Sequence, residues 1–216
     1  MKRLFLPLLV AALPFCANAQ KITYFGKAKI LACQDASYYM QGAIKEIDGK
    51  ITFTETIDVP GMSKDAIYNT LLQWASLRFM PNTENGMWNE RNYFKNRDYA
   101  SINNDKASGT ITIKGDEEWV FSSKTLSKDF TRAFYTLDIT VTDGKVVFGM
   151  NNIFYKYEGS NNEHMVAEEW ITDSESITKD GKGLHRRFGK FRVRTIDVKD
   201  QLIADIKASL NKSKGQ

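Results

Sequence analysis

The sequence has few of the residue types that most often carry chemistry, and it lacks long hydrophobic runs. Its 216 residues include two cysteines and two histidines, too few for a disulfide framework or for a zinc site of His and Cys ligands alone. After the first twenty residues, no apolar run approaches the roughly 20 residues that a transmembrane helix needs. The formal net charge is only +4, which does not indicate an anionic partner.

The first nineteen residues have the composition of a secretory signal peptide. The basic pair Lys2-Arg3 precedes an apolar run over residues 4–15, and Ala17-Asn18-Ala19 then offers an A-x-A cleavage site. The apolar run is too short to cross a bilayer as a helix. We therefore expect residues 1–19 to be removed and the remaining chain, without a transmembrane segment, to reach the periplasm or the extracellular space.

Cleavage there would leave Cys33 as an unpaired cysteine, because Cys16 belongs to the removed segment. The sequence favours a small buried hydrophobic role for Cys33 over a reactive or intermolecular thiol. A lipid anchor on either cysteine is the alternative. The bulky Phe15 before Cys16 and the lysines before Cys33 fit lipoprotein processing poorly, so the anchored form is the weaker hypothesis.

The stretch 51–79 predicts a strand followed by a helix. Apolar side chains alternate with Thr or Asp from residue 51 to residue 59, as in a strand with one buried face. Pro60-Gly61 ends this strand, and Ser63 can cap a helix over residues 64–79. The apolar side chains of that helix share one broad arc: Ile67, Tyr68, Leu71, Leu72, Trp74, Ala75 and Phe79.

More strands are predicted after a polar loop over residues 80–95. They cover residues 98–102, 109–121, 133–142 and 145–157. Asp48-Gly49 and Asp143-Gly144 predict tight hairpin turns. In the last strand the apolar parity changes on either side of Asn151-Asn152, so one extra residue must be absorbed there and we predict a β-bulge.

The C-terminal part predicts a polar extension and then a second helix. Residues 159–196 are polar, with short structured pieces expected. Asp197 can cap a helix with an apolar stripe that ends at Leu210, and residues 213–216 should fray. Residues 20–41 show no clear period and are treated as an N-terminal segment, which leaves residues 42–212 as one domain.

The predicted order is strand, helix, four strands, helix (β-α-β-β-β-β-α). A mostly antiparallel sheet with one apolar face needs both helices on that face, which predicts a two-layer α+β fold. The opposite face would carry threonines: Thr52, Thr54, Thr56, Thr110, Thr112, Thr136 and Thr140.

Several segments together resemble one bacterial family of exported proteins. They are residues 48–74, 115–121, 167–171, 189–192 and 195–197. The family is a domain of unknown function with a fold like that of the TATA-binding protein (TBP-like), and the resemblance extends from about Tyr38 to Leu210. It implies a strand, helix, four-strand, helix order, in agreement with the order reached from the residues, and it implies no catalytic or ligand-binding residue.

The residues do not form a recognisable catalytic or metal site. Glu163-His164 with Glu168 and Glu169 could supply metal ligands, but they lack H-E-x-x-H spacing, and solvated charge is the favoured interpretation. Glu117 and Glu118 are neighbours on a predicted strand, so they point to opposite faces. There is no G-x-S-x-G motif and no Gly-rich phosphate loop. We expect no catalytic residues, no metal and no cofactor.

Two features are candidates for a binding surface. Arg186, Arg187, Lys190 and Arg192 belong to a basic run with interleaved apolar residues, which could meet anionic lipid headgroups or acidic glycans. The favoured alternative is that nearby acidic side chains neutralise them. Trp88, in the polar loop, would suggest a carbohydrate or partner surface if it is exposed, although an anchoring role under the loop is favoured.

The sequence therefore favours a non-enzymatic exported module that binds a partner or has a structural role in the cell envelope. An envelope protein, a glycan or a lipid headgroup would be the partner. Nucleic acid is not expected, because the predicted outer face carries Thr rather than Lys and Arg. The alternative is a carrier that holds a small apolar ligand between the helices and the sheet.

Overall fold

The computed structural model describes residues 20–79, 100–157 and 165–214. The predicted signal peptide, the predicted loop over residues 80–95 and Trp88 within it lie outside these ranges. Within them, no helix has both the length and the apolar character that are needed to span a bilayer.

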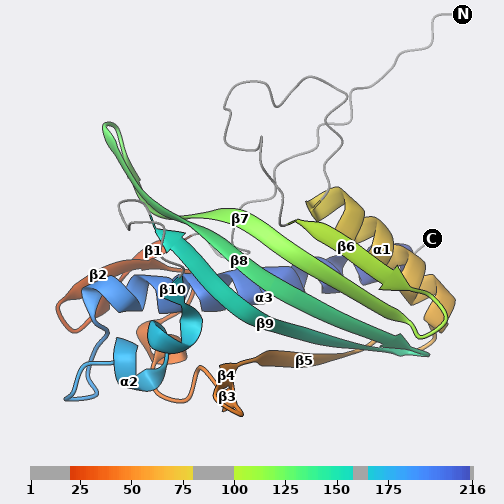
Figure 1. Cartoon of the computed structure of the whole chain (residues 1–216), viewed down its shortest axis with the longest axis horizontal. Helices are drawn as coiled ribbons and strands as arrows, with labels where there is room; N and C mark the ends of the chain where they lie inside the picture. The colour runs from red at the N-terminus through yellow and green to blue at the C-terminus, as the bar shows by residue number, and fades with distance from the viewer. Residues whose placement is uncertain (1–19, 80–99, 158–164, 215–216) are drawn as a thin grey trace, which may run out of the picture.

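The centre of the fold is an antiparallel sheet, which faces the viewer in Figure 1. Its strands follow the order β10-β9-β8-β7-β6, and β5 pairs with the half of β9 that β10 does not reach. Strand β5 therefore forms an edge of the sheet. The bounds are β5 (Phe53–Asp58), β6 (Ser101–Asp105), β7 (Thr110–Lys124), β8 (Ser127–Thr142), β9 (Lys145–Tyr157) and β10 (Met165–Val166).

Alternating side chains give the sheet one apolar face. In β8, Leu137, Ile139 and Val141 are buried, whereas Asp138 and Thr140 between them are exposed. Successive residues of a strand point to opposite faces, so one face of the strand meets the core and the other remains open. The threonines predicted for the open face are exposed or half-buried, except Thr136, which is buried.

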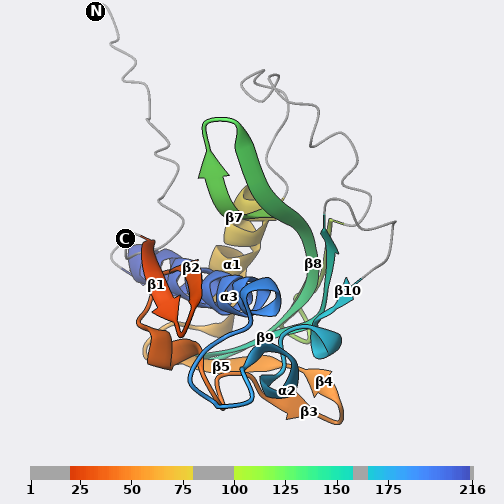
Figure 2. The ribbon, with the colours of Figure 1, turned by 90° about the vertical axis from the view of Figure 1, so that its left-hand side faces the viewer.

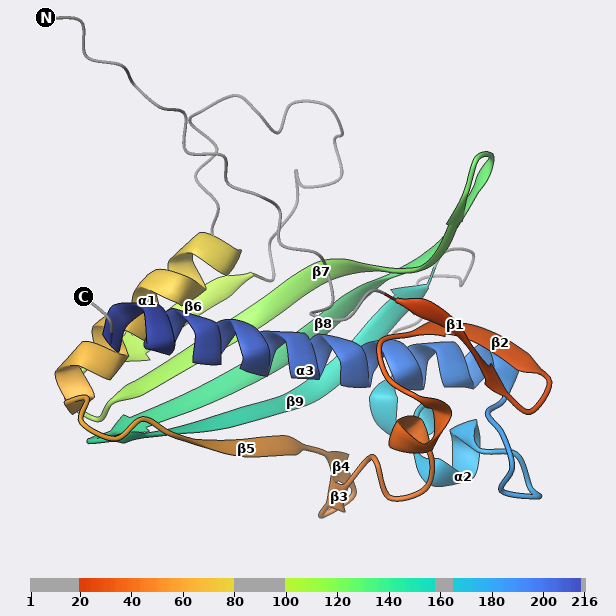
Figure 3. The ribbon, with the colours of Figure 1, turned by 180° about the vertical axis from the view of Figure 1, so that it is seen from behind.

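Helices α1 (Lys64–Phe79) and α3 (Arg186–Lys214) cover the apolar face, and Figure 3 shows both in front of the sheet. Helix α1 begins as predicted, because the backbone N–H of Ala66 donates to Ser63 Oγ at 3.3 Å. Its predicted arc is buried, apart from the half-buried Leu72. Each fully buried large apolar side chain contributes about 1.5–3 kcal/mol. The predicted two-layer α+β fold with two helices on one face is confirmed.

The C-terminal helix is longer than predicted. It begins at Arg186 and not at Asp197, which lies buried in its middle and is no cap. Every residue from Phe191 to Val198 is buried, because this part of α3 packs between the sheet and the N-terminal segment. A helix that is buried all round has no amphipathic stripe, so the sequence pattern gave no sign of it.

The N-terminal segment forms a small hairpin of its own. Strands β1 (Lys21–Phe25) and β2 (Ala28–Ala32) pair only with each other, and the 3-10 helix η1 (Ala36–Tyr39) follows. The hairpin lies against the first half of α3, as Figure 2 shows. Residues 21–32, for which the sequence shows no clear period, therefore form a two-stranded sheet that is separate from the main sheet.

The local turn and bulge predictions are confirmed. Strands β3 (Glu46–Ile47) and β4 (Lys50–Ile51) are joined by Asp48 and Gly49, with φ of 51° and 71°, as a type I′ turn requires. In β9, Asn152 and Ile153 together oppose one residue of β8, and Asn152 has a φ of 48°. The segment before α3 contains the short pieces expected there: β10, η4 (Ala167–Glu169) and α2 (Asp173–Ser176).

Candidate functional site

The outer edge of β5 has backbone hydrogen-bonding groups that no other strand of the described residues uses. The N–H of Val59 donates to the carbonyl of Gly144 at 2.7 Å, in register with the β5–β9 ladder. In an antiparallel pair, residues alternate between bonding their partner and pointing away from it. Thr54, Thr56 and Asp58 therefore direct their N–H and C=O groups away from β9, toward the open edge.

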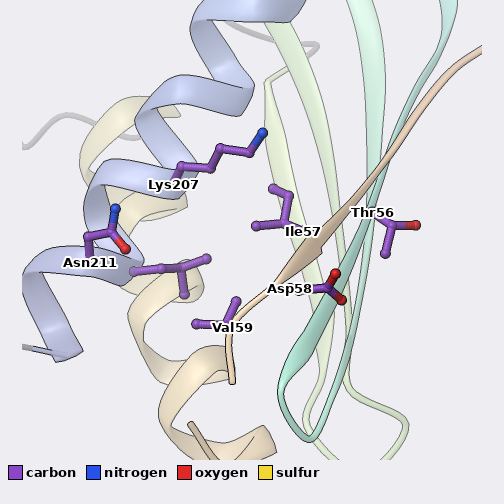
Figure 4. Close-up of a pocket in the computed structure, with 7 residues that line it drawn as sticks. Thr56, Ile57, Asp58, Val59, Lys207 and Asn211 are labelled. Carbon is purple, nitrogen blue, oxygen red and sulfur yellow. The ribbon is translucent and has the colours of Figure 1, made fainter. Parts of the chain in front are cut away.

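A groove of about 270 Å³ lies beside this edge, between β5 and the last turns of α3. Ile57 of β5, Val59 directly after this strand and Leu210 of α3 are buried and form its apolar floor. Figure 4 shows Lys207 and Asn211 of α3 facing Ile57 and Val59 across the groove. Thr56 and Asp58 lie on the other side of the strand in this view.

One ion pair crosses from the helix to the strand next to the groove. Lys207 Nζ lies 3.1 Å from Glu55 Oε1, and 47% and 42% of the two side chains are exposed. A pair this exposed contributes between 0 and about 1 kcal/mol. It can therefore open at little cost when another group approaches. Asp58, exposed on the outer face, adds a carboxylate near the same edge.

The sequence did not single out this edge. Pairing shows β5 to be an edge strand, but its partner β9 lies about ninety residues further along the chain. A signal was nevertheless present in Glu55 and Asp58, because charged residues are common on edge strands that must avoid aggregation.

The four basic residues proposed as one surface do not share it. Arg186 and Arg187 are exposed, Lys190 is half-buried and Arg192 is buried. Lys190 donates to both carboxylate oxygens of Asp129, at 2.9 and 2.8 Å. The prediction of a single basic binding patch is wrong for Arg192 and Lys190, because the helical period turns them inward.

Arg192 instead joins three segments inside the molecule. Its guanidinium donates to the carbonyls of Tyr39 at 2.6 Å, Met40 at 2.7 Å and Ile171 at 2.7 Å, and it pairs with Asp173 at 2.6 Å. Burial lowers the pKa of Arg192, and the hydrogen bond to Asp173 opposes that effect. This side chain fixes η1 and α2 to α3, so it has a structural role.

Asp197 makes a second buried connection, about one and a half turns further along α3. It accepts hydrogen bonds from the Tyr39 hydroxyl and, at 3.2 Å, from the Cys33 N–H. Burial raises the pKa of Asp197 to about 6. Cys33 itself is disulfide-bonded in the whole chain. Cys16 lies outside the described residues, and an unpaired Cys33 after cleavage stays a prediction.

The predicted chemical candidates do not converge. Glu117 faces the helices and pairs with an arginine of α1, whereas Glu118 pairs with a lysine of β8 on the other side of the strand. Glu168 accepts the N–H of Ile51 at 3.1 Å. Within residues 20–79, 100–157 and 165–214, no group of three or more His, Cys, Asp or Glu could hold a metal ion. Glu163 and His164 lie outside these ranges.

Known families and structures match the fold. The profile of a family described as a domain of unknown function (DUF4468) with TBP-like fold matches residues 53–156. The chain is 33% identical to a DUF4468 family protein from Bacteroides ovatus ATCC 8483, with a TM-score of 0.70 over 82% of this chain and 95% of that one. A TBP-like protein from Parabacteroides distasonis ATCC 8503 is 23% identical, with a TM-score of 0.57 over 77% and 96%. No curated protein matches.

Proposed function

Because the chain belongs to the DUF4468 family, a domain of unknown function with a TBP-like fold, we propose its function from its own geometry. We infer that it is a non-enzymatic binding module of the cell envelope, which takes up an extended peptide segment of a partner protein along β5. The observation that carries this proposal is the row of outward backbone groups at Thr54, Thr56 and Asp58, next to a groove.

An extended peptide would bind by adding a strand to the sheet. Each outward residue of β5 offers one backbone donor and one backbone acceptor, and main-chain hydrogen bonds supply the affinity in this mode of recognition. The edge lies open along the lower margin of the sheet in Figure 1. The existing ladder holds β5 in an extended conformation, so the partner alone would need ordering.

The groove would select one side chain of the peptide. Alternate residues of an added strand point toward the helices, where Ile57, Val59 and Leu210 form an apolar floor. A volume of about 270 Å³ is small for a whole ligand, since ligand pockets usually measure about 300–1,000 Å³, but it suits one large apolar side chain. On the outer face, Asp58 would favour a basic residue opposite it.

A substitution at Thr56 tests the proposal. Proline lacks the N–H and is tolerated on an edge strand where that N–H faces away from the ladder. Thr56→Pro should therefore fold normally and lose at least about tenfold in affinity for peptides selected on the wild-type protein from a random display library. The matched control is Thr56→Val, which keeps the backbone N–H and should bind within about threefold of wild type.

The readouts are isothermal titration calorimetry and amide hydrogen exchange. Bound peptide should protect the amides of Thr54, Thr56 and Asp58, which point outward. Equal affinity of the selected peptides for the wild-type protein and Thr56→Pro would contradict the proposal. Native mass spectrometry of protein purified from its own compartment adds a second check, because a stoichiometric small apolar ligand would instead support a carrier.

A further inference from the structure

A second surface lies at the other end of α3, where the N-terminal hairpin meets the loop before the helix. The two segments touch through their backbones, since a Cβ added to Gly183 would lie 2.7 Å from the carbonyl oxygen of Phe25. Gly183 therefore permits the contact. Figure 2 looks at this end, with β1 and β2 beside the start of α3. The packing brings Phe25 and Gly26 against Lys182 and Gly183, and Ile30 against Gly189.

Exposed cations gather around this contact. Lys27, Lys29, Lys182 and Arg186 are all exposed, and none of them forms an ion pair with another residue of the described ranges. Asp180 is the acid beside them. Hydrogen bonds from a threonine hydroxyl and from the N–H of Lys182 lower the pKa of Asp180, so it offsets one charge. A local excess of positive charge remains.

Two large apolar side chains lie exposed on the same hairpin. In β1, Thr23 and Phe25 are buried, which turns Ile22 and Tyr24 outward with 62% and 61% of each residue exposed. Lys29 Nζ lies 5.5 Å from the centre of the Tyr24 ring. A strand of a monomeric protein usually places polar residues on its outer face, so this exposure is unexplained by the fold.

We propose that this end of the molecule docks on an anionic lipid surface. The cations around the Gly26–Gly183 contact would meet the headgroups, and Ile22 and Tyr24 would enter the boundary between headgroups and acyl chains. Basic residues with adjacent aromatic and aliphatic side chains bind membranes in this way. The position of Lys29 over Tyr24 lets the amine reach the phosphates while the ring points inward.

The exposed side chains of Ile22 and Tyr24 favour a lipid surface over other polyanions as the binding partner. An acidic glycan would use the same cations, but burying Ile22 would add little to its binding. A helix rises 1.5 Å per residue, so Arg186 and the groove at Lys207 lie roughly 30 Å apart along α3. A protein docked by its basic end would therefore hold the edge of β5 away from the lipid and accessible to a partner.

Vesicle binding of the full chain without residues 1–19 tests the inference. The protein should sediment with vesicles of phosphatidylcholine and phosphatidylglycerol, not with phosphatidylcholine alone, and high salt should weaken binding. The variant with Lys27, Lys29, Lys182 and Arg186 changed to Gln should lose roughly fivefold in affinity per cation, more than about 100-fold in total. The variant Ile22→Ser, Tyr24→Ser should bind more weakly without a change in salt dependence.

Matched variants separate this surface from net charge and from the β5 edge. Changing the exposed Lys45, Lys50, Lys106 and Lys145 to Gln removes the same charge elsewhere and should leave vesicle binding within about threefold. Thr56→Pro should not alter it. An equal loss of vesicle binding in the two four-residue variants would overturn the proposal. It would also be overturned if the protein bound an acidic polysaccharide more tightly than vesicles and Ile22→Ser, Tyr24→Ser left that binding unchanged.

Discussion

Asp197 should make the stability of the protein fall as the pH rises through weakly acidic values. Burial raises the pKa of Asp197 from an ordinary 3.8 to about 6. Between these two values the folded protein keeps a proton that the unfolded chain has lost. Stability is therefore highest below about pH 4 for this group and is lost as the pH rises to about 6. One pKa unit corresponds to about 1.4 kcal/mol, which gives about 3 kcal/mol in all.

Replacing Asp197 by Asn isolates this contribution. The Asn oxygen can still accept the hydroxyl of Tyr39, but its amide cannot accept the N–H of Cys33, which keeps a 3.0 Å bond to the Tyr39 oxygen. Asn also removes a charge that Arg194 stabilises and Asp200 destabilises. The variant should therefore lose some stability at low pH and gain relative to wild type as the pH rises.

Urea unfolding, followed by tryptophan fluorescence from about pH 4 to pH 8, measures the difference. The unfolding free energy of the wild type minus that of Asp197→Asn should fall by about 2–3 kcal/mol across this range. Other titrating groups are common to both proteins and cancel in the difference. A difference that stays constant, or that increases with pH, would refute the assignment of a raised pKa to Asp197.

Three further changes test the packing. Arg192→Met should cost about 3–5 kcal/mol in urea unfolding, because the carbonyls and the carboxylate around the guanidinium lose their buried donor; Arg186→Met, at an exposed site, should stay within about 0.5 kcal/mol. Gly115→Ala should lower stability by about 1–3 kcal/mol, since its Cβ would lie 2.4 Å from the buried ring of Tyr135, and equal stability would contradict this packing. Asn152→Val should cost about 1–2 kcal/mol, whereas Asn152→Gly should not, because the bulge needs a positive φ.

The elements that the sequence predicted well are those with one buried face. The strand and helix of residues 51–79 and the hairpin of β8 and β9 alternate clearly between core and solvent. The periods of these elements, the helix cap at Ser63 and the bulge at Asn152 could therefore be predicted from the sequence. The first half of α3 has no such pattern. Arg192, Arg194 and Asp197 are buried in it. The partners of Arg192 and Asp197 lie in residues 33–40 and 171–176, which local reasoning cannot associate with a helix.

Neither of the two proposed binding surfaces could be predicted from the sequence alone. Arg186, Arg187, Lys190 and Arg192 looked like one patch, but a helix has 3.6 residues per turn, so Lys190 and Arg192 turn inward. The proposed lipid-binding surface instead includes Lys27 and Lys29 of the N-terminal hairpin. They belong to it because Gly183 lets the hairpin touch the loop before α3. Likewise, β5 is an open edge only because β9 pairs with its other side. Each proposed site depends on contacts between distant segments, and α3 connects them, with the basic end at its start and the groove at its last turns.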